Sequence, residues 1–256
     1  MCGIVGYVGP RLATPMLIDG LKRMEYRGYD SAGVALLGDD GVNMRRAKGK
    51  IAALESTVAA RPIGGTTGIG HTRWATHGVP SEKNAHPQRD CTGTIAVVHN
   101  GIIEKYSVLR KRLIEAGHVF KSDTDTEVLA HLIEAAFRGN LEEAVTEALN
   151  LVEGTYGIAV ISSRDPDKIV AARKGSPLLI GLGDGENYVA SDVAAILQHT
   201  RQVVYLDDGE MAVLTGDAYR VFDLDANDIA KNVNRIDWDL EQIEKGGFEH
   251  FMLKEI

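Results

Sequence analysis

Residues 156–172 read Tyr-Gly-Ile-Ala-Val-Ile-Ser-Ser-Arg-Asp-Pro-Asp-Lys-Ile-Val-Ala-Ala, two apolar runs on either side of a turn sequence. Asp165-Pro166-Asp167 supplies the turn, and the flanking runs are rich in the β-branched residues that favour strands. Gly183-Asp184-Gly185 separates a second pair of runs, at 178–182 and 187–190, in the same way. Both stretches therefore predict strands joined as antiparallel hairpins.

Similar apolar runs extend this pattern along the rest of the chain, at 4–8, 31–37, 67–71, 94–98, 202–206, 210–215 and 219–224. Helical periodicity is strongest at 140–152, behind Asn140, which we expect to cap the helix. Other helices are predicted at 15–24, 50–60, 104–116 and 125–138. Because the helices precede residue 153 and mostly strands follow, the pattern indicates an α+β fold with antiparallel sheets, and not alternating β-α-β units.

The chain has 256 residues and a formal net charge of −8, from 28 basic and 36 acidic side chains. This balance argues against nucleic-acid binding, which needs basic clusters. No apolar stretch approaches the roughly 18 residues of a membrane span, and the first residues lack the basic region of a signal peptide. The two cysteines, Cys2 and Cys91, form no disulfide framework. We therefore expect a cytoplasmic protein that binds neither nucleic acid nor membrane.

Cys2 is the first candidate for chemistry. A small residue at this position lets an aminopeptidase remove Met1, and the exposed α-amine then has a pKa of about 8, suited to a general base at neutral pH. Nucleophile and base would then sit on one residue. The alternative is structural, with Cys2 as a small apolar residue that leads into the strand at 4–8.

The nine residues at 70–78 contain two histidines, an arginine and a tryptophan. The planar guanidinium of Arg73 suits a carboxylate, and a tryptophan in this segment suits a mobile lid. A metal site would have to use His71, His77 and His86, whose spacings of six and nine fit no common helical ligand pair. We therefore expect no metal here. The alternative to a substrate site is a strand end with satisfied polar side chains.

Two further motifs each allow a structural and a chemical interpretation. Asn100-Gly101 is typical of a type I′ hairpin turn, but its side-chain amide and backbone N–H could instead face one negative oxygen, as an oxyanion hole. The segment 122–127 contains ordinary helix caps, yet three acids in six residues exceed what capping needs, so one carboxylate is a candidate for a substrate ammonium. Cys91 has no neighbouring acid or base other than Asp90, and we expect it to be inert.

Six motifs follow one another along the chain: Cys2-Gly3-Ile4-Val5-Gly6, Glu25 to Ser31, His71 to Gly78, Asn84-Ala85-His86-Pro87, Val98 to Ile103 and Thr124-Asp125-Thr126-Glu127. Together they resemble the class II glutamine amidotransferases, which use an N-terminal nucleophile. The resemblance spans essentially the whole chain, and it is closest to the glutaminase half of glutamine–fructose-6-phosphate aminotransferases. It implies the N-terminal nucleophile hydrolase fold, a four-layer αββα sandwich of two antiparallel sheets.

The resemblance also implies catalytic roles. Cys2 would be the nucleophile and, once Met1 is removed, its own base. Asn100 and Gly101 would hold the oxyanion, and Arg27 would help to orient the N-terminal residue.

Substrate binding is implied by the same resemblance. Arg73 would bind the α-carboxylate of L-glutamine and Asp125 its α-ammonium, with Thr76 and His77 nearby. Trp74 would belong to a loop that closes over the substrate.

The family further implies that residues 2–224 form the glutaminase domain and that 225–256 begin a linker. A sugar-isomerase half would follow Ile256 and use the ammonia to convert fructose 6-phosphate to glucosamine 6-phosphate, in a full-length enzyme that we expect to be a homo-oligomer. The charged, helix-leaning sequence that follows 225, where the predicted strands stop, fits this division. No cofactor and no metal are implied.

The sequence departs from the family pattern at Lys105, where asparagine is usual, and at Gln88, where histidine often follows His-Pro. Lys105 is close enough to Asn100 to affect the contacts of that loop. Two alternatives stay open. One is the glutaminase domain of an amidotransferase for purine or asparagine synthesis, although the segment 73–77 and the tail speak against it. The other is a non-enzymatic regulatory or binding module that has kept the fold.

Overall fold

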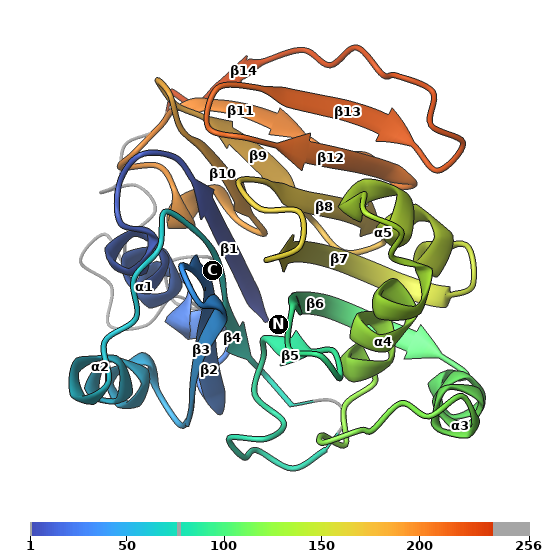
Figure 1. The fold of residues 1–256 in the computed structure, drawn as a ribbon. Coiled ribbons are helices and arrows are strands. Elements are labelled where there is room, and N and C mark those ends of the chain that lie inside the picture. Colours follow the sequence, from blue (N-terminus) through green and yellow to red (C-terminus); the bar gives the residue numbers. More distant parts are fainter. Residues whose placement is uncertain (1, 76–77, 238–256) are drawn as a thin grey trace, which may run out of the picture.

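The computed structural model describes residues 2–75 and 78–237, which form two antiparallel sheets flanked by helices (Figure 1). The first sheet has the strand order β14 (Asn234–Arg235), β11 (Gln202–Tyr205), β9 (Leu179–Leu182), β10 (Asn187–Ala190), β1 (Gly3–Val8), β4 (Thr67–Arg73), β2 (Ser31–Gly38) and β3 (Gly41–Lys48). The second has the order β13 (Tyr219–Asp223), β12 (Glu210–Leu214), β8 (Ile169–Lys174), β7 (Glu153–Ser162), β6 (Ile95–Glu104) and β5 (Gln88–Arg89).

The helices form the two outer layers, with α1 (Ala13–Arg23) and α2 (Ile51–Ala60) on the first sheet and α3 (Tyr106–Glu115), α4 (Thr126–Ala136) and α5 (Leu141–Leu149) on the second (Figure 1). Two short 3₁₀ turns, η1 (Glu25–Arg27) and η2 (Val193–Ala195), complete the described elements. The predicted four-layer αββα arrangement is therefore confirmed.

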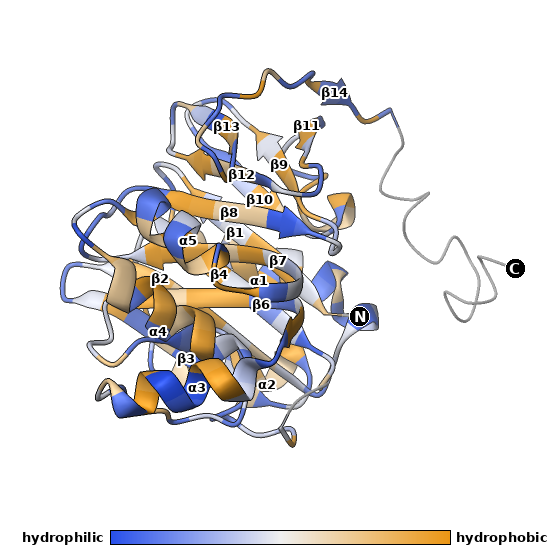
Figure 2. Ribbon diagram, turned by 90° about the vertical axis from the view of Figure 1, so that its right-hand side faces the viewer, coloured by the Kyte–Doolittle hydropathy of each residue, from blue (hydrophilic) through white to orange (hydrophobic). Residues whose placement is uncertain are grey.

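Three hydrophobic cores hold these layers together. In β6, Ala96 and Val98 point into the core between the sheets, whereas Val97 points into the core beneath α4. This alternation follows from the two-residue period of a strand. Both faces of the central strands are buried, and Figure 2 shows β6, β7 and β8 coloured largely as hydrophobic.

All the strands and helices predicted before residue 225 are present. Most ends shift by a few residues, whereas β6 continues to Glu104 from a predicted end at 98. Asn140 caps α5 as expected, since its side chain accepts a hydrogen bond from the backbone N–H of Glu143 (3.0 Å). β3 and the two-residue β5 were not predicted. β3 lies at a sheet edge and carries Arg45, Arg46 and Lys48, so its sequence lacks the apolar run of a central strand.

The prediction that the strands stop at 225 is wrong. β14 pairs with β11, and Ile236 is buried, with its N–H donating to the carbonyl of Arg201 (2.8 Å). Within 225–237 the structure contains no helix, and the remainder of the predicted helix-leaning tail lies outside the described residues. None of the described helices has the length and apolarity needed for a membrane crossing.

Three strands from the two sheets position the site described below. β1 begins beside the end of β4, where Gly3 pairs with Thr72. The middle of β6, from the opposite sheet, lies close to both, because the side-chain amide of Asn100 donates to the backbone carbonyl of Cys2 (3.1 Å). The site therefore lies where the two sheets meet.

Candidate active site

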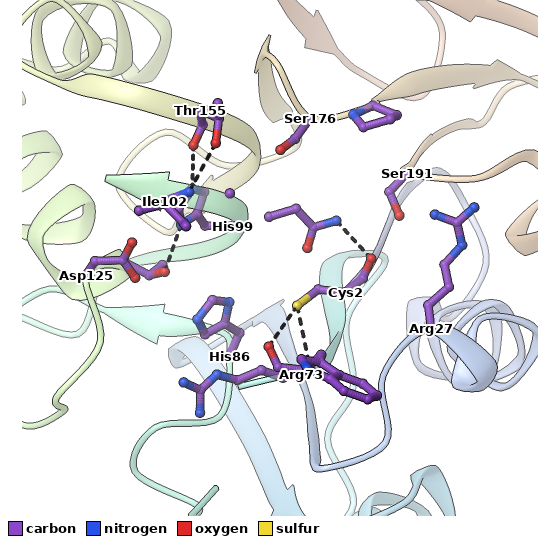
Figure 3. Close-up of a pocket in the computed structure, with 15 residues that line it drawn as sticks. Cys2, Arg27, Arg73, His86, His99, Ile102, Asp125, Thr155, Ser176 and Ser191 are labelled. Atoms are coloured by element: carbon purple, nitrogen blue, oxygen red, sulfur yellow. Dashed lines mark hydrogen bonds between the residues drawn. The ribbon is translucent and has the colours of Figure 1, made fainter. Parts of the chain in front are cut away.

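A pocket of about 400 Å³ opens at the start of β1 (Figure 3). Its lining comes from both sheets and from the loops between them: Cys2, Arg27, Arg73, Trp74, His86, His99, Asn100, Gly101, Ile102, Asp125, Thr126, Thr155, Ser176, Pro177 and Ser191. Seven of the nine predicted catalytic, orienting and substrate-binding residues are among them. The predicted substrate-binding residues Thr76 and His77 lie outside the described residues.

The Cys2 thiol lies against the backbone of Trp74. Sγ accepts a hydrogen bond from the Trp74 N–H (3.2 Å) and lies 3.5 Å from the Trp74 carbonyl oxygen (Figure 3). Burial raises the pKa of the Cys2 thiol above its ordinary value. The sulfur is therefore protonated at neutral pH, and it requires a base before it can act as a nucleophile.

Ser191 fixes the strand that carries Cys2. Its hydroxyl accepts a hydrogen bond from the N–H of Ile4 (2.9 Å), and its own N–H donates to the Ile4 carbonyl (3.0 Å). Next to it, Asp192 forms an ion pair with Arg27, which also lines the pocket. Arg27 thus contacts the segment that holds the start of β1 in place.

Asn100 lies inside β6, and His71 sets the orientation of its amide. Nε2 of His71 lies 3.0 Å from Oδ1 of Asn100 and 3.1 Å from the carbonyl oxygen of His99. Both partners are acceptors, so Nε2 carries a proton and donates it. With Oδ1 held in this way, Nδ2 of Asn100 faces Cys2, to whose carbonyl it donates. Burial lowers the pKa of His71 to about 3, so the ring is neutral.

Gly101 continues β6, opposite Tyr156 of β7, so the alternative of a hairpin turn at Asn100-Gly101 is wrong. Its φ of +134° is one that other residues rarely adopt, and a Cβ atom there would lie 2.1 Å from the carbonyl oxygen of Thr155. Only glycine is accommodated at this position. This unusual backbone conformation comes directly after Asn100 in the chain, and both residues line the pocket.

Two side chains of opposite charge, Arg73 and Asp125, also line the pocket. Arg73 is the last residue of β4; it is buried, and Nη2 donates to the carbonyl of Gly78 (3.2 Å). Asp125 precedes α4 but makes no capping bond to it, so the capping alternative is wrong for this residue. Instead, Oδ2 accepts a hydrogen bond from the N–H of Ile103 (2.9 Å). A buried cation and a buried anion thus line the same pocket.

Trp74 follows Arg73 directly and is half exposed, with its ring edge-on to Tyr29 (5.6 Å between centroids). Gly28 allows this arrangement, because a Cβ atom there would lie 2.8 Å from the backbone of Arg73. A tryptophan at the rim of the pocket is placed to contact a bound molecule.

The two departures from the family pattern have local explanations. Lys105 adopts a left-handed conformation (φ 53°), which favours asparagine over lysine, and its ammonium pairs with Glu153 at the surface (2.6 Å). Gln88 is buried, and Nε2 donates to the carbonyls of Lys83 and Ala85 (3.2 and 3.0 Å). Neither residue lines the pocket.

Sequence reasoning missed the supporting residues. From the sequence, His71 is considered only as a possible metal ligand, and Ser191 and Asp192 are assigned no role. Their partners, Asn100, Ile4 and Arg27, are far away in the sequence. The one local signal is that His71 lies within the apolar run at 67–71, which is predicted to be a strand.

Comparisons with known proteins agree with this geometry. A family model described as a glutamine amidotransferase domain matches residues 71–198. The glutamine–fructose-6-phosphate aminotransferase (isomerizing) of Chlorobaculum tepidum is 57% identical over 263 residues, and that of Thermococcus kodakarensis is 51% identical over 259 residues. Each alignment covers 100% of this chain and 43% of the relative, so the chain spans less than half the length of these curated relatives.

Two known structures are similar over most of the chain. The glutamine phosphoribosylpyrophosphate amidotransferase from B. subtilis superposes with a TM-score of 0.75 at 25% identity, over 89% of this chain and 50% of that chain. A structure described as the allosteric regulatory enzyme of purine biosynthesis gives a TM-score of 0.76 at 26% identity, over 88% and 50%.

Proposed function

This chain belongs to the glutamine amidotransferase family, as a class II glutaminase domain of the kind found in glutamine–fructose-6-phosphate aminotransferases, and from that premise we propose that it hydrolyses L-glutamine to glutamate and ammonia. The observation that supports this most is a single pocket lined by the Cys2 thiol, the Asn100 amide and the oppositely charged Arg73 and Asp125. A nucleophile, an oxyanion donor and a clamp for an amino acid are what amide hydrolysis requires.

The reaction proceeds through a thioester. Once Met1 is removed, the α-amine of Cys2 takes the proton of the buried thiol, and the thiolate attacks the side-chain carbonyl carbon of glutamine. The C–N bond then breaks, and ammonia leaves with the proton from the α-ammonium. Water attacks the thioester carbonyl, glutamate is released and the thiol is regenerated. Nucleophile and base are thus one residue.

The negative charge that develops on the carbonyl oxygen is stabilised by Asn100 Nδ2 and the N–H of Gly101. In the structure Nδ2 donates to the Cys2 carbonyl, on the side of Asn100 that faces the thiol. His71 holds the Asn100 amide in this orientation through its hydrogen bond to Oδ1.

Arg73 binds the α-carboxylate of glutamine and Asp125 its α-ammonium. Oδ1 of Asp125 has no hydrogen-bond partner among the described residues, so one carboxylate oxygen is available to the substrate. We assign Thr76 and His77 to the same substrate site, Trp74 to the loop that covers it, and Arg27 to the orientation of Cys2.

The ammonia is used, in this proposal, by a sugar-isomerase half of a longer chain, which converts fructose 6-phosphate to glucosamine 6-phosphate. Relatives with that name are 51–57% identical to this chain, whereas the purine-type structures are 25–26% identical. We assign the glutaminase domain to residues 2–224 and the start of a linker to 225–256, with contacts to the first sheet that continue to Ile236.

The experiment is an assay of glutamate release by protein whose mass shows that Met1 is absent. Hydrolysis is expected, with loss of activity in Cys2→Ala and in a form with a noncleavable extension before Cys2. Full activity in the extended form would contradict the role of the α-amine. Absence of glutamate from the Met1-free wild type would favour the regulatory-module alternative.

A second readout addresses the destination of the ammonia. The 256-residue chain supplied with glutamine and fructose 6-phosphate is expected to release ammonia and to form no aminosugar phosphate. A longer chain that includes a sugar-isomerase half is expected to form glucosamine 6-phosphate. Aminosugar from the 256-residue chain would contradict the division into two catalytic halves.

A further inference from the structure

Four side chains outside the pocket converge on one point at the outer face of the second sheet. They are Cys91, from the loop between β5 and β6, His118, from the loop after α3, and His131 and Glu134, from α4. Sγ of Cys91, Nδ1 of each histidine and Oε2 of Glu134 all lie within 4.8 Å of one another. We propose that these four atoms bind a structural zinc ion.

The distances between the four atoms match a tetrahedral site. Zn–S bonds of about 2.3 Å and Zn–N bonds of about 2.05 Å at tetrahedral angles place S and N about 3.6 Å apart, and N and a carboxylate O about 3.3 Å apart. Sγ of Cys91 lies 3.7 Å from Nδ1 of His118 and 3.5 Å from Nδ1 of His131. Oε2 of Glu134 lies 2.9 and 3.2 Å from the same two nitrogens. Adjustments of a few tenths of an ångström are enough to admit the ion.

The surrounding backbone fixes the cysteine in this position. Sγ of Cys91 accepts a hydrogen bond from the N–H of Val119 (3.1 Å), and the N–H of Cys91 donates to Oε2 of Glu134 (3.2 Å). Asp90 secures the loop by accepting from the N–H groups of Thr92 and Ile95 (3.2 and 2.9 Å). A backbone N–H directed at the sulfur stabilises a thiolate, the form of cysteine that binds metal.

His131 is the deepest member of the cluster, with no exposed side-chain surface, and its other nitrogen supports the assignment. Nε2 makes no hydrogen bond within the described chain and faces Oε1 of Glu127 at 3.7 Å. Histidines that bind metal through one nitrogen commonly direct the other toward a carboxylate. Glu127 is itself fixed by the N–H groups of Lys121 and Ser122 (2.7 and 2.6 Å). Glu127, held in this way, orients the His131 ring so that Nδ1 points at the other three ligand atoms.

The chemistry of the four ligand atoms indicates which metal the site binds and whether the metal is structural or catalytic. A thiolate with two imidazoles suits zinc, and it excludes magnesium and calcium, which prefer oxygen ligands. Four protein ligands close the coordination shell, which is typical of a structural site and not of a catalytic one. The ion would link the loop at 90–94 and the loop at 117–125 to α4. The second of these loops ends at Asp125, in the wall of the pocket.

The test uses the 256-residue chain stripped of metal by a chelator and titrated with Zn²⁺, and with Co²⁺ as a spectroscopic probe. We expect a single ion per chain, a thiolate-to-cobalt charge-transfer band and visible bands of tetrahedral intensity. At zinc concentrations about 100-fold above Kd, Tm should rise by about 5–10 °C. None of these readouts depends on glutamine hydrolysis.

The variants separate this site from other thiols and histidines. Cys91→Ser should abolish the charge-transfer band, and Cys91→Ser, His118→Ala and Glu134→Gln should each weaken binding at least about 100-fold, since loss of a mere supporting residue already costs about 10–100-fold. Cys2→Ala and His199→Ala are matched controls that should bind as the wild type does. Circular dichroism in the absence of metal verifies that each variant is folded.

Three results would overturn the proposal. They are failure of the wild-type chain to bind Zn²⁺ or Co²⁺ with a definite stoichiometry, retention of the charge-transfer band in Cys91→Ser, and unchanged affinity in both His118→Ala and Glu134→Gln. In the first case the cluster would be a hydrogen-bonded network alone.

Discussion

Replacing His71 with leucine tests whether the orientation of the Asn100 amide limits catalysis. His71 is fully buried and neutral, and its Nε2–H donates to Oδ1 of Asn100 and to the carbonyl of His99 (3.0 and 3.1 Å). This donation determines which end of the amide faces Cys2. His71 does not line the pocket, so it acts through Asn100 as a positioning residue.

The expected magnitude follows from the lost contact. His71→Leu leaves the oxygen of the Asn100 amide without its donor, at a cost of about 1–3 kcal/mol. If that cost falls on the transition state, kcat decreases about 5- to 150-fold. Complete loss of an oxyanion donor, typically about 10²–10³-fold, sets the upper limit. We therefore expect kcat to fall about 10- to 100-fold, with KM nearly unchanged because Arg73 and Asp125 keep their places.

Steady-state glutamate release, coupled to glutamate dehydrogenase, measures both constants. His71→Gln is the matched variant, since its amide N–H has a similar reach and should restore part of kcat, and His199→Ala controls for the loss of a histidine elsewhere. The reasoning is refuted by a folded His71→Leu protein with wild-type kcat. It is equally refuted if the whole loss appears in KM.

Three further predictions concern the same site. Asn100→Ala should lower kcat about 10²–10³-fold in the coupled assay with little change in KM; a rate near that of the wild type would exclude an oxyanion role. Arg73→Ala and Asp125→Ala should each raise KM about 30- to 1000-fold, from about 2–4 kcal/mol for a buried charge-assisted contact; unchanged KM in both would show that the clamp is misassigned. Because the pKa of His71 is about 3 when folded and about 6.5 when unfolded, the unfolded chain alone takes up the proton between these values, so the stability is fully present above pH 6.5 and is lost as the pH falls toward 3. Urea unfolding at pH 7 and pH 5 should therefore show about 2 kcal/mol of lost stability that is absent in His71→Leu, and an equal loss in both proteins would contradict this account.

Most of the fold could be predicted from the sequence because burial in this molecule is local and periodic. The central strands are apolar on both faces, and the helices carry one apolar stripe. Each element therefore produces a recognisable hydrophobic pattern within about five to ten residues of sequence. β3 was missed because an edge strand with Arg45 and Arg46 lacks that signal. β14 is two residues long and depends on its pairing with β11, which no local pattern records.

The pocket was predictable for a different reason. Cys2, Arg73, Asn100 and Asp125 belong to short motifs whose order along the chain is specific, and the structure brings their side chains to one cavity. The residues that orient them carry no such signal. Ser191 is tied to Ile4 across 187 positions, and a serine that holds a strand resembles any other serine in the sequence.

The turn alternative for Asn100-Gly101 and the expectation that Cys91 is inert both rest on sequence neighbours alone. Asn-Gly favours a turn in isolation, but β7 pairs with β6 through this point, and the ladder overrides the local preference while glycine absorbs the unusual backbone angle. For Cys91 the expectation considers Asp90 as the one acid or base beside it in the sequence. Its real neighbours, His118, His131 and Glu134, arrive from a loop and a helix 27 to 43 positions away. This cluster depends on the packing of α4 on the sheet, so no local stretch of sequence indicates it.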